Sequence, residues 1–328
     1  IYTVKDTLSL HDALPICYTQ TGGVVTVNDP NQVRIGVNES NNGGVNADSI
    51  GTMDLRNADP GSSFYMNGDW LRVGMGRNAQ GQLLFGDNFD VRIGGPSGTN
   101  IEIGDDRGAL VTTSTTGIVR MSDGTVAVLA NEFDIGRAQN TSSTSVTGEL
   151  DLASAAVGLN GFDIAVGTSH IGYGGNATGT FRAPQGEISS NTVQLGDDDT
   201  GTFAGGSGLA ELNDTTWTID NGDRLVINES GTARTFVTGE SSGFSLERTT
   251  DGLTIAAGNA GALELIFDDP SFSPSAGNPY WGLRWAYTST DHITELTDFI
   301  NDGTIVISTT GTLNPGDVVV ANLNDGGT

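Results

Sequence analysis

The chain has 328 residues, with 14 Lys and Arg against 40 Asp and Glu, and its net charge at pH 7 is −26. This acidity argues against a nucleic-acid-binding protein, which needs a basic footprint, and against docking on an anionic membrane. With 48 Gly and 36% hydrophobic residues, the chain is rich in turns and yet too apolar to be disordered.

Residues 1–16 differ in composition from the rest of the chain. Lys5 is the only lysine, and His11 is one of three histidines. Residues 7–16, with the sequence TLSLHDALPI, resemble the translation of a short-read sequencing-library adapter, and residues 1–3 match the preceding part of that adapter. We therefore predict that residues 1–16 are an adapter-derived artefact that packs poorly against the rest of the protein. We also expect both ends of the chain to be fragment boundaries.

A short motif recurs along residues 17–260, and it consists of an apolar residue, any residue, a second apolar residue and a glycine. It occurs at residues 33–36, 71–74, 91–94, 101–104, 133–136, 164–167 and 193–196. Segments that begin with glycine often follow it, at residues 51–55, 81–85, 148–152, 179–181 and 201–203. The alternation places one set of side chains inward, and glycine permits a corner with positive φ.

One such unit cannot bury its apolar face alone, so the copies must stack on one another. Stacked short strands with irregular loops predict an all-β fold, a parallel β-helix (β-solenoid) over residues 17–260. Only 16% of the residues are charged, and a surface of neutral polar groups is typical of such a solenoid. A flat β-sandwich is the alternative.

The composition changes in residues 261–328, where we predict a truncated, β-rich C-terminal capping module. Strands are expected at residues 263–267, 304–307 and 318–320, around an aromatic segment at 280–285. One short helix is expected at residues 291–301, capped by Asp291 and ended by Gly303. Such a module would cover the open end of the solenoid and its edge strands. The sequence contains no apolar run of transmembrane length.

Two sets of motifs resemble known families. The apolar-x-apolar-Gly and Gly-Thr-Phe units resemble the repeats of autotransporter passenger domains. The segments ALELIFD (262–268), YWGLRW (280–285) and LTDFINDGTI (296–305) together resemble the region ahead of the sorting tail in PEP-CTERM exported proteins. The Pro-Glu-Pro tag and basic tail that define that family are absent from this sequence. The resemblance implies a bacterial protein at the cell surface or outside the cell, with a structural or adhesive role and glycans, cell-surface or matrix components as partners.

Two acidic segments are candidates for chemistry, GDDRG at residues 104–108 and GDDDTG at 196–201. Paired carboxylates can hydrolyse glycosides, but the His and Lys motifs that accompany them in polysaccharide hydrolases are absent. We interpret both segments as solvated turns that follow strands, and we predict no catalytic residue and no cofactor. The alternative at Asp197, Asp198 and Asp199 is one low-affinity calcium ion, because hard oxygen ligands in a turn suit Ca²⁺.

Other metal and cysteine sites find little support in the sequence. His170 and His292 cannot form a zinc site without acidic ligands, and Cys17 alone allows no disulfide framework. We therefore predict a secreted or cell-surface structural or adhesive repeat protein without enzymatic activity. The alternatives are a polysaccharide-active lyase or hydrolase on a β-helix, and a phage or appendage fibre that forms an intertwined trimer.

Overall fold

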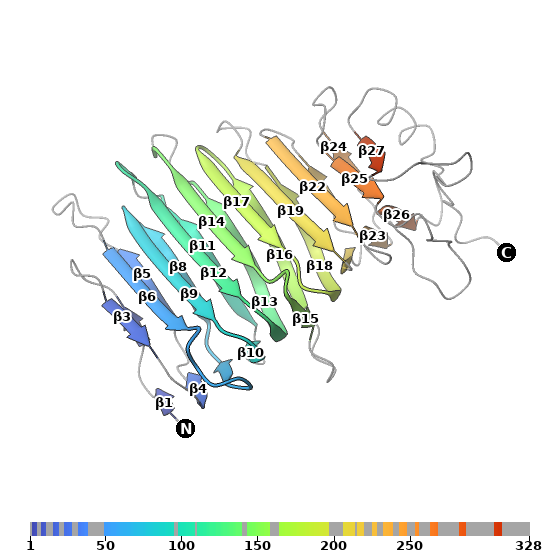
Figure 1. The fold of residues 1–328 in the computed structure, drawn as a ribbon. Coiled ribbons are helices and arrows are strands. Elements are labelled where there is room, and N and C mark those ends of the chain that lie inside the picture. The colour runs from blue at the N-terminus through green and yellow to red at the C-terminus, as the bar shows by residue number, and fades with distance from the viewer. Residues whose placement is uncertain are drawn as a thin grey trace.

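The computed structural model describes residues 2–4, 8–10, 16–19, 23–27, 32–38, 49–94, 98–108, 110–139, 143–157, 164–196, 206–213, 215–219, 225–227, 232–238, 243–247, 253–255, 263–267, 282–286 and 305–309. They form two sheets, and all the paired strands in them run parallel. Figure 1 shows these strands stacked along one axis, from the blue N-terminal strands to the red C-terminal ones. The predicted all-β parallel β-helix is confirmed.

The described strands divide between a larger sheet A and a smaller sheet B. Sheet A contains β1 (Tyr2–Val4), β2 (Leu8–Leu10), β4 (Val24–Val27), β5 (Gln32–Asn38), β7 (Ser63–Met66), β8 (Trp70–Gly76), β10 (Phe89–Ile93), β11 (Thr99–Asp105), β13 (Gly124–Arg137), β15 (Ala155–Val157), β16 (Ile164–Tyr173), β18 (Gly186–Leu195), β20 (Thr215–Ile219), β21 (Leu225–Ile227), β23 (Gly243–Glu247), β24 (Leu253–Ile255) and β26 (Gly282–Ala286). Sheet B contains β3 (Ile16–Thr19), β6 (Ser49–Leu55), β9 (Ala79–Phe85), β12 (Thr115–Met121), β14 (Val146–Asp151), β17 (Ala177–Arg182), β19 (Ser207–Asn213), β22 (Thr232–Thr238), β25 (Leu263–Phe267) and β27 (Ile305–Thr309).

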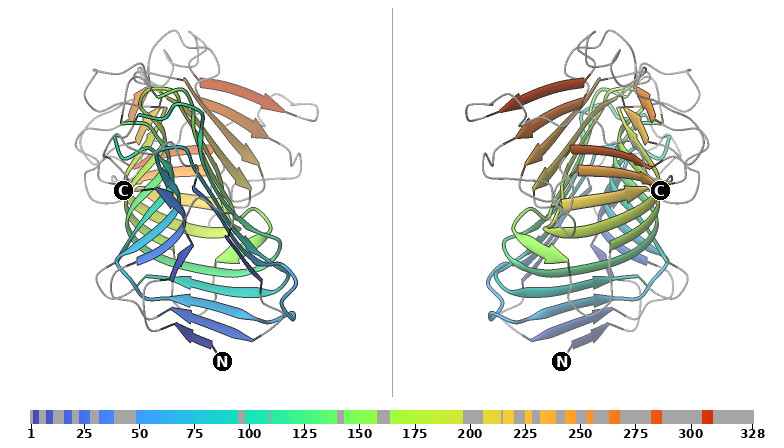
Figure 2. Two further views of the ribbon diagram at one scale, coloured as in Figure 1. Left: turned by 90° about the vertical axis from the view of Figure 1, so that its left-hand side faces the viewer. Right: turned by 90° about the vertical axis from the view of Figure 1, so that its right-hand side faces the viewer.

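Each turn of the coil, here called a rung, passes once through sheet B and twice through sheet A. In one rung the chain leaves β9 in sheet B, forms β10 and then β11 in sheet A, and returns to sheet B as β12. In the next rung the long strand β13 takes both places in sheet A, because it pairs with β10 along its first half and with β11 along its second. Figure 2 shows the rungs from the two ends of the stack, with the blue strands at the bottom of each view.

The interior between the sheets is apolar because every second side chain of a strand points into it. Ile101 and Ile103 of β11 lie in register with Phe133 and Ile135 of β13, and these side chains are at most 3% exposed. Aromatic rings add edge-to-face contacts across the interior, with ring centroids 6.4 Å apart for Phe133 and Phe181. Burial of such side chains is the main source of stability in a stack of repeats.

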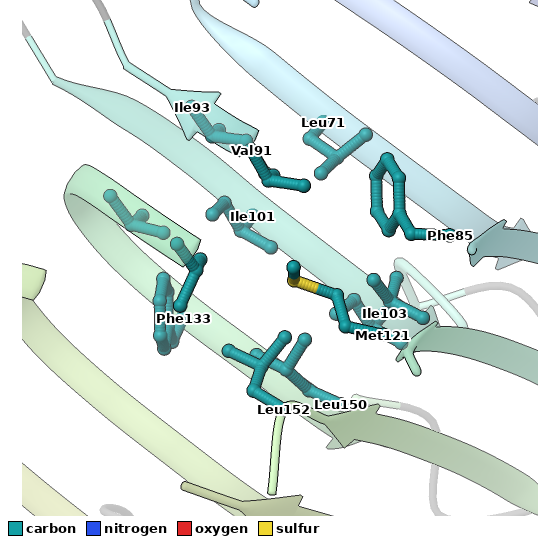
Figure 3. A pocket seen from close by; sticks show the side chains of 13 residues that line it. Leu71, Phe85, Val91, Ile93, Ile101, Ile103, Met121, Phe133, Leu150 and Leu152 are labelled. Carbon is teal, nitrogen blue, oxygen red and sulfur yellow. The ribbon is translucent and has the colours of Figure 1, made fainter. Parts of the chain in front are cut away.

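A small cavity lies in the interior between the two sheets. It has a volume of about 20 Å³ and is lined by thirteen apolar side chains, among them Phe85, Ile103 and Leu150. Figure 3 shows these side chains converging from strands of both sheets. The space would admit one water molecule at most, and a cavity with an apolar lining stays dry. We therefore interpret it as a packing defect of the core.

Two rows of glycine bring the backbones of the two sheets into direct contact. Gly51, Gly81, Gly117, Gly148, Gly179 and Gly208 of sheet B lie in register with one another. Facing them are Gly36, Gly74, Gly104, Gly136 and Gly172 of sheet A, each with a φ between +60° and +67°. A Cβ atom on Gly136 would lie 2.1 Å from the carbonyl oxygen of Thr178, so no other residue fits there. The predicted corner role of glycine is confirmed at Gly36, Gly74, Gly104 and Gly136, all of which have a positive φ.

Two units of the predicted repeat, residues 91–94 and 164–167, lie in the first half of their rungs, because Ile93 and Ile164 are both in register with Val128. The second of them corrects the predicted corner. The sequence motif at residues 164–167 places a corner at Gly167, yet Ile164 lies in register with Val128 in the first half of β13. The corner of this rung is Gly172, which has a φ of +67°. It was missed because Ser169, a polar residue, occupies the position that Phe133 fills in the preceding rung.

The strands near both ends of the chain follow the same coil. The backbones of β1 and β2 pair in parallel with β4 and β5, but the side chains of residues 1–16 lie outside the described residues, so their predicted poor packing stays a prediction. At the other end β25 pairs with β22, β26 with β23, and β27 with β25. The helix predicted at residues 291–301 lies outside the described residues, and the separate capping module also stays a prediction. In the described part of the chain, no helix has the length and apolarity needed to span a bilayer.

Candidate functional site

A row of charged and polar side chains runs along the outer face of sheet A, on the strands whose inner face forms the core. It consists of Arg34, Arg72, Glu102, Asp134, His170 and Gln194, each in register with the next. We call this row the charged ladder. Its four central side chains are buried although they point away from the apolar interior, and Asp134 is only 1% exposed.

The burial of the charged ladder comes from side chains on either side of it along the strands. Trp70 lies two residues before the arginine of the ladder on β8, and the guanidinium of Arg72 stacks over its ring at 4.2 Å from the centroid. Tyr173, beyond the corner glycine of β16, packs against His170 with the ring centroids 4.8 Å apart and the ring planes tilted by 57°. The corner glycine turns the strand so that the residue after it covers the ladder. Side chains alternate between the core and the outer face along each strand, so the charged ladder would otherwise be exposed to solvent.

The first half of the ladder is a buried ion-pair group around Glu102. Its Oε2 accepts a hydrogen bond from Arg72 Nε at 2.8 Å, and its Oε1 accepts one from Arg107 Nη1 at 2.6 Å. Arg72 Nη1 also donates to Gln32 Oε1 at 2.6 Å, on the strand of the rung before. Burial raises the pKa of Glu102, against the opposite effect of Arg72 and Arg107. Both oxygens of this carboxylate therefore have a cationic partner.

The second half of the ladder is centred on Asp134. Its Oδ2 accepts a hydrogen bond from Arg137 Nη1, and its Oδ1 lies 2.8 Å from His170 Nδ1. Glu132 Oε1 lies 3.5 Å from the same imidazole nitrogen. Burial alone would lower the pKa of His170, but the hydrogen bonds to Asp134 and Glu132 outweigh it and raise that pKa to about 9. The hydrogen bond to His170 also lowers the pKa of Glu132.

The acidic pair Asp105 and Asp106 corrects a prediction from the sequence. We expected a solvated turn, and the turn is present, but both side chains are 0% exposed. Asp106 holds the corner together, because its Oδ1 accepts from the backbone N–H groups of Gly108 and Gln139, and its Oδ2 from Ser143. The bonds to Gln139 and Ser143 connect consecutive rungs, which explains why the Asp106 side chain is buried.

Asp105 is buried in a different way. Its Oδ1 accepts a hydrogen bond from the backbone N–H of Arg107 at 2.6 Å. No donor among the described residues lies within hydrogen-bonding distance of its Oδ2. Burial, with the negative charges of Asp134 and Glu102, raises the pKa of Asp105 well above its usual range. This is the least compensated charge of the described part of the ladder region.

Two groups of three side chains in this region have the chemistry of metal ligands. One comprises Glu132, Asp134 and His170, and the other comprises Glu102, Asp105 and Asp134; in each, the potential ligand atoms lie within 4.8 Å of one another. The sequence analysis missed both groups, since their members come from different rungs. One signal was present, because opposite charges occupy the same position of successive motifs, at Arg72, Glu102 and Asp134. The calcium candidates Asp197, Asp198 and Asp199 lie outside the described residues.

The outer face of sheet B is different, because its polar groups are open to solvent. Gln80, Thr116, Thr147, Thr178 and Ser207 lie in register along it, and each is half-buried or exposed. We call them the hydroxyl row. Beside it, Arg120 donates two hydrogen bonds of 2.8 Å to Glu149, and Arg182 donates to Glu149 and to Glu211. This arrangement is typical of an exposed solenoid face.

Comparisons with known proteins add no family to these observations. No protein-family model, no curated protein and no solved structure matches the chain. The resemblance to autotransporter passenger repeats and to PEP-CTERM exported proteins therefore stays a prediction from sequence motifs. What the structure assigns to the chain is the parallel β-solenoid fold.

Proposed function

We propose that this protein is a structural or adhesive rod of the bacterial cell surface or extracellular matrix, without catalytic activity. The observation that carries the proposal is the unbroken parallel stacking of rungs, which repeats the same surface positions at a fixed spacing along an axis. A repeated surface suits an extended, repetitive partner such as a polysaccharide, because many weak contacts add along its length.

The hydroxyl row supports glycans as the partner. Its Thr, Ser and Gln side chains offer both donors and acceptors of hydrogen bonds, which sugar hydroxyl groups need. Adjacent members are one strand spacing apart, about 4.8 Å. The charges beside the row, Arg120, Glu149 and Arg182, are paired with one another, so the face as a whole presents neutral polar groups.

The buried carboxylates favour a structural role over polysaccharide cleavage. A general acid must reach the glycosidic oxygen of its substrate. Asp105 has the raised pKa of such an acid, but its side chain is 0% exposed. The carboxylates of Glu102 and Asp134, at 2% and 1% exposure, have cationic partners in the same ladder. These groups are placed to join rungs to one another.

The proposal is tested with the purified full chain on a glycan array and by co-sedimentation with bacterial extracellular polysaccharides. We expect binding that the triple variant Thr116→Val, Thr147→Val, Thr178→Val weakens, because valine keeps the shape and removes the hydroxyl groups. The matched control is Thr168→Val with Thr192→Val, which lie in register on the outer face of sheet A. This control should bind as the unchanged protein does.

Three results would contradict the proposal in different ways. Absence of binding to any polysaccharide, together with no retention at the cell surface, would remove the adhesive role. Release of reducing or unsaturated sugars would instead favour a polysaccharide-active enzyme. A trimer mass in light scattering would favour an appendage fibre, whereas we expect the mass of one chain.

A further inference from the structure

Three ligand-type atoms on adjacent strands converge near the solvent edge of the charged ladder. Glu132 and Asp134 lie two residues apart on the outer face of β13, and His170 lies in register with Asp134 on β16. His170 Nδ1 is 2.8 Å from Asp134 Oδ1 and 3.5 Å from Glu132 Oε1. The three side chains are thus held by two consecutive rungs, independently of any surface loop.

Neighbouring groups fix the orientation of these atoms. Arg137 Nη1 donates to Asp134 Oδ2 and also, at 3.4 Å, to Glu132 Oε1, which leaves Asp134 Oδ1 turned toward the imidazole. A bound ion would replace the longer of these two hydrogen bonds, the one to Glu132. Tyr173 packs against the imidazole ring with the centroids 4.8 Å apart and the planes tilted by 57°, which restricts the rotation of the imidazole. Hydrogen-bonded or packed neighbours of this kind orient metal ligands in proteins and tune their affinity.

Two further observations make the position suitable for a cation. Glu132 is about a third exposed, with a side-chain accessibility of 32%, so an ion and its water ligands can reach the three atoms. The orphaned Oδ2 of fully buried Asp105 belongs to a carboxylate within 4.8 Å of that of Asp134. This oxygen has no hydrogen-bond donor among the described residues, so a cation bound nearby would stabilise the ionised form that burial now disfavours.

The neighbouring group of Glu102, Asp105 and Asp134 is less suitable. Both oxygens of Glu102 are occupied by Arg72 and Arg107. All three side chains are at most 2% exposed, so water could not complete the coordination shell of an ion. The group also lacks a nitrogen ligand.

We propose that Glu132 Oε1, Asp134 Oδ1 and His170 Nδ1 bind one Zn²⁺ ion, with water as the fourth ligand. One imidazole nitrogen and two carboxylate oxygens are ligands that zinc accepts, and tetrahedral zinc places its ligand atoms about 3.4 Å apart. The 3.5 Å separation from Glu132 fits this value. The 2.8 Å separation from Asp134 must widen as the ion takes the place of the proton between His170 and Asp134. That proton leaves to solvent.

The role of the ion would be structural. It would join β13 to β16 across the rung boundary, where the strands are otherwise held by backbone hydrogen bonds and the imidazole–carboxylate contact. Binding to the folded chain alone raises stability in proportion to the logarithm of the free ion concentration. This site does not depend on the adhesive role proposed above.

The test is a zinc titration of the full chain after treatment with EDTA and removal of the chelator. Calorimetry in two buffers of different ionisation enthalpy should give one ion per chain and release of protons. The Tm should rise with added Zn²⁺, and excess Ca²⁺ should not compete, since calcium prefers a shell of six to eight oxygens. A chain that binds no Zn²⁺, or that binds Ca²⁺ as well as Zn²⁺, would overturn the proposal.

Variants distinguish this site from adventitious binding to an acidic protein. Glu132→Gln should weaken zinc binding at least about tenfold, whereas Glu187→Gln, an exposed position on β18, changes the charge equally and should bind like the unchanged chain. His170→Gln should abolish binding, with His292→Asn as its control. If His170→Gln fails to fold, the two glutamate variants still decide, because neither side chain is in the core. Equal affinities for these two variants would refute the site.

Discussion

Around Asp134 the two faces of β13 are both buried, yet they are built from opposite kinds of side chain. Phe133 and Ile135 point into the apolar interior, and Asp134 points to the outer face, but all three are at most 1% exposed. The inner face needs only shape and apolarity, because dispersion and hydrophobic burial have no direction. The outer face needs a partner for each charge, because a buried charge without one is costly. On the charged face, removing one side chain leaves its partner buried without an opposite charge. On the apolar face, each side chain contributes its own burial free energy to stability.

Gly136→Ala should disturb the packing on both faces of β13, and of the variants considered it should lower the free energy of unfolding the most. The new Cβ would lie 2.1 Å from the Thr178 carbonyl oxygen, at a φ of +67°, so the two sheets would have to separate. We expect a loss of more than about 4 kcal/mol in the free energy of unfolding, measured by urea denaturation. Gly61→Ala is the control, since Gly61 has a φ of +83° but nothing within 4 Å of the added atom. It should cost only about 1–2 kcal/mol of backbone strain, and equal losses would contradict the close contact.

Phe133→Ala tests the inner face alone. Removing this ring, which is 1% exposed, should leave a cavity and lower the free energy of unfolding by about 3–5 kcal/mol. The loss should be nearly independent of salt and pH, because no charge is involved. A strong dependence on ionic strength would show that the inner and outer faces cannot be treated separately.

Glu102→Leu tests the outer face. It leaves Arg72, whose side chain is 7% exposed, without its carboxylate, and should cost about 3 kcal/mol. The double variant Arg72→Met, Glu102→Leu should recover most of the lost free energy of unfolding, because it removes the unpaired charge. No second substitution is expected to compensate for Phe133→Ala in this way. Arg120→Ala is the exposed control, with a side chain 52% accessible, and should cost less than about 1 kcal/mol. Absence of recovery in the double variant would contradict the mutual dependence of the ladder charges.

The pH dependence of stability should show the smallest of these effects. In EDTA, the folded pKa of His170 is about 9, above the ordinary value of about 6.5 for an unfolded chain. The protonated form is therefore favoured by folding, so its contribution is fully present below pH 6.5 and is lost as the pH rises through 9. We expect a decrease on the order of 2 kcal/mol in denaturant titrations between these pH values. His170→Gln should remove most of it, and an unchanged slope would refute the assignment.

The fold was predictable to the extent that it depends on local pattern. Apolar alternation and corner glycines, such as those around Ile103 and Gly104, predict parallel stacked strands without knowledge of the partners. The charged ladder was not predictable in the same way. Whether Asp134 meets Arg137 and His170 or meets solvent depends on which residues of other rungs lie in register, and this changes with each irregular loop. The displaced corner at Gly172 shows how one polar residue, Ser169, is enough to hide that register.

The corners between the sheets differ greatly in length, although the strands they join do not. Residues 106–114 connect β11 to β12, whereas residues 174–176 connect β16 to β17 at the same point of a later rung. Because the described strands of each rung pair with those of the rungs directly before and after it, an insertion at such a corner leaves the repeat positions on both sides unchanged. Duplication of the gene segment for one rung would therefore lengthen the rod by one rung. Insertion of a foreign peptide at a long corner would add a surface loop without changing the strands. Diversity can accumulate at the corners while the strands keep their sequence pattern.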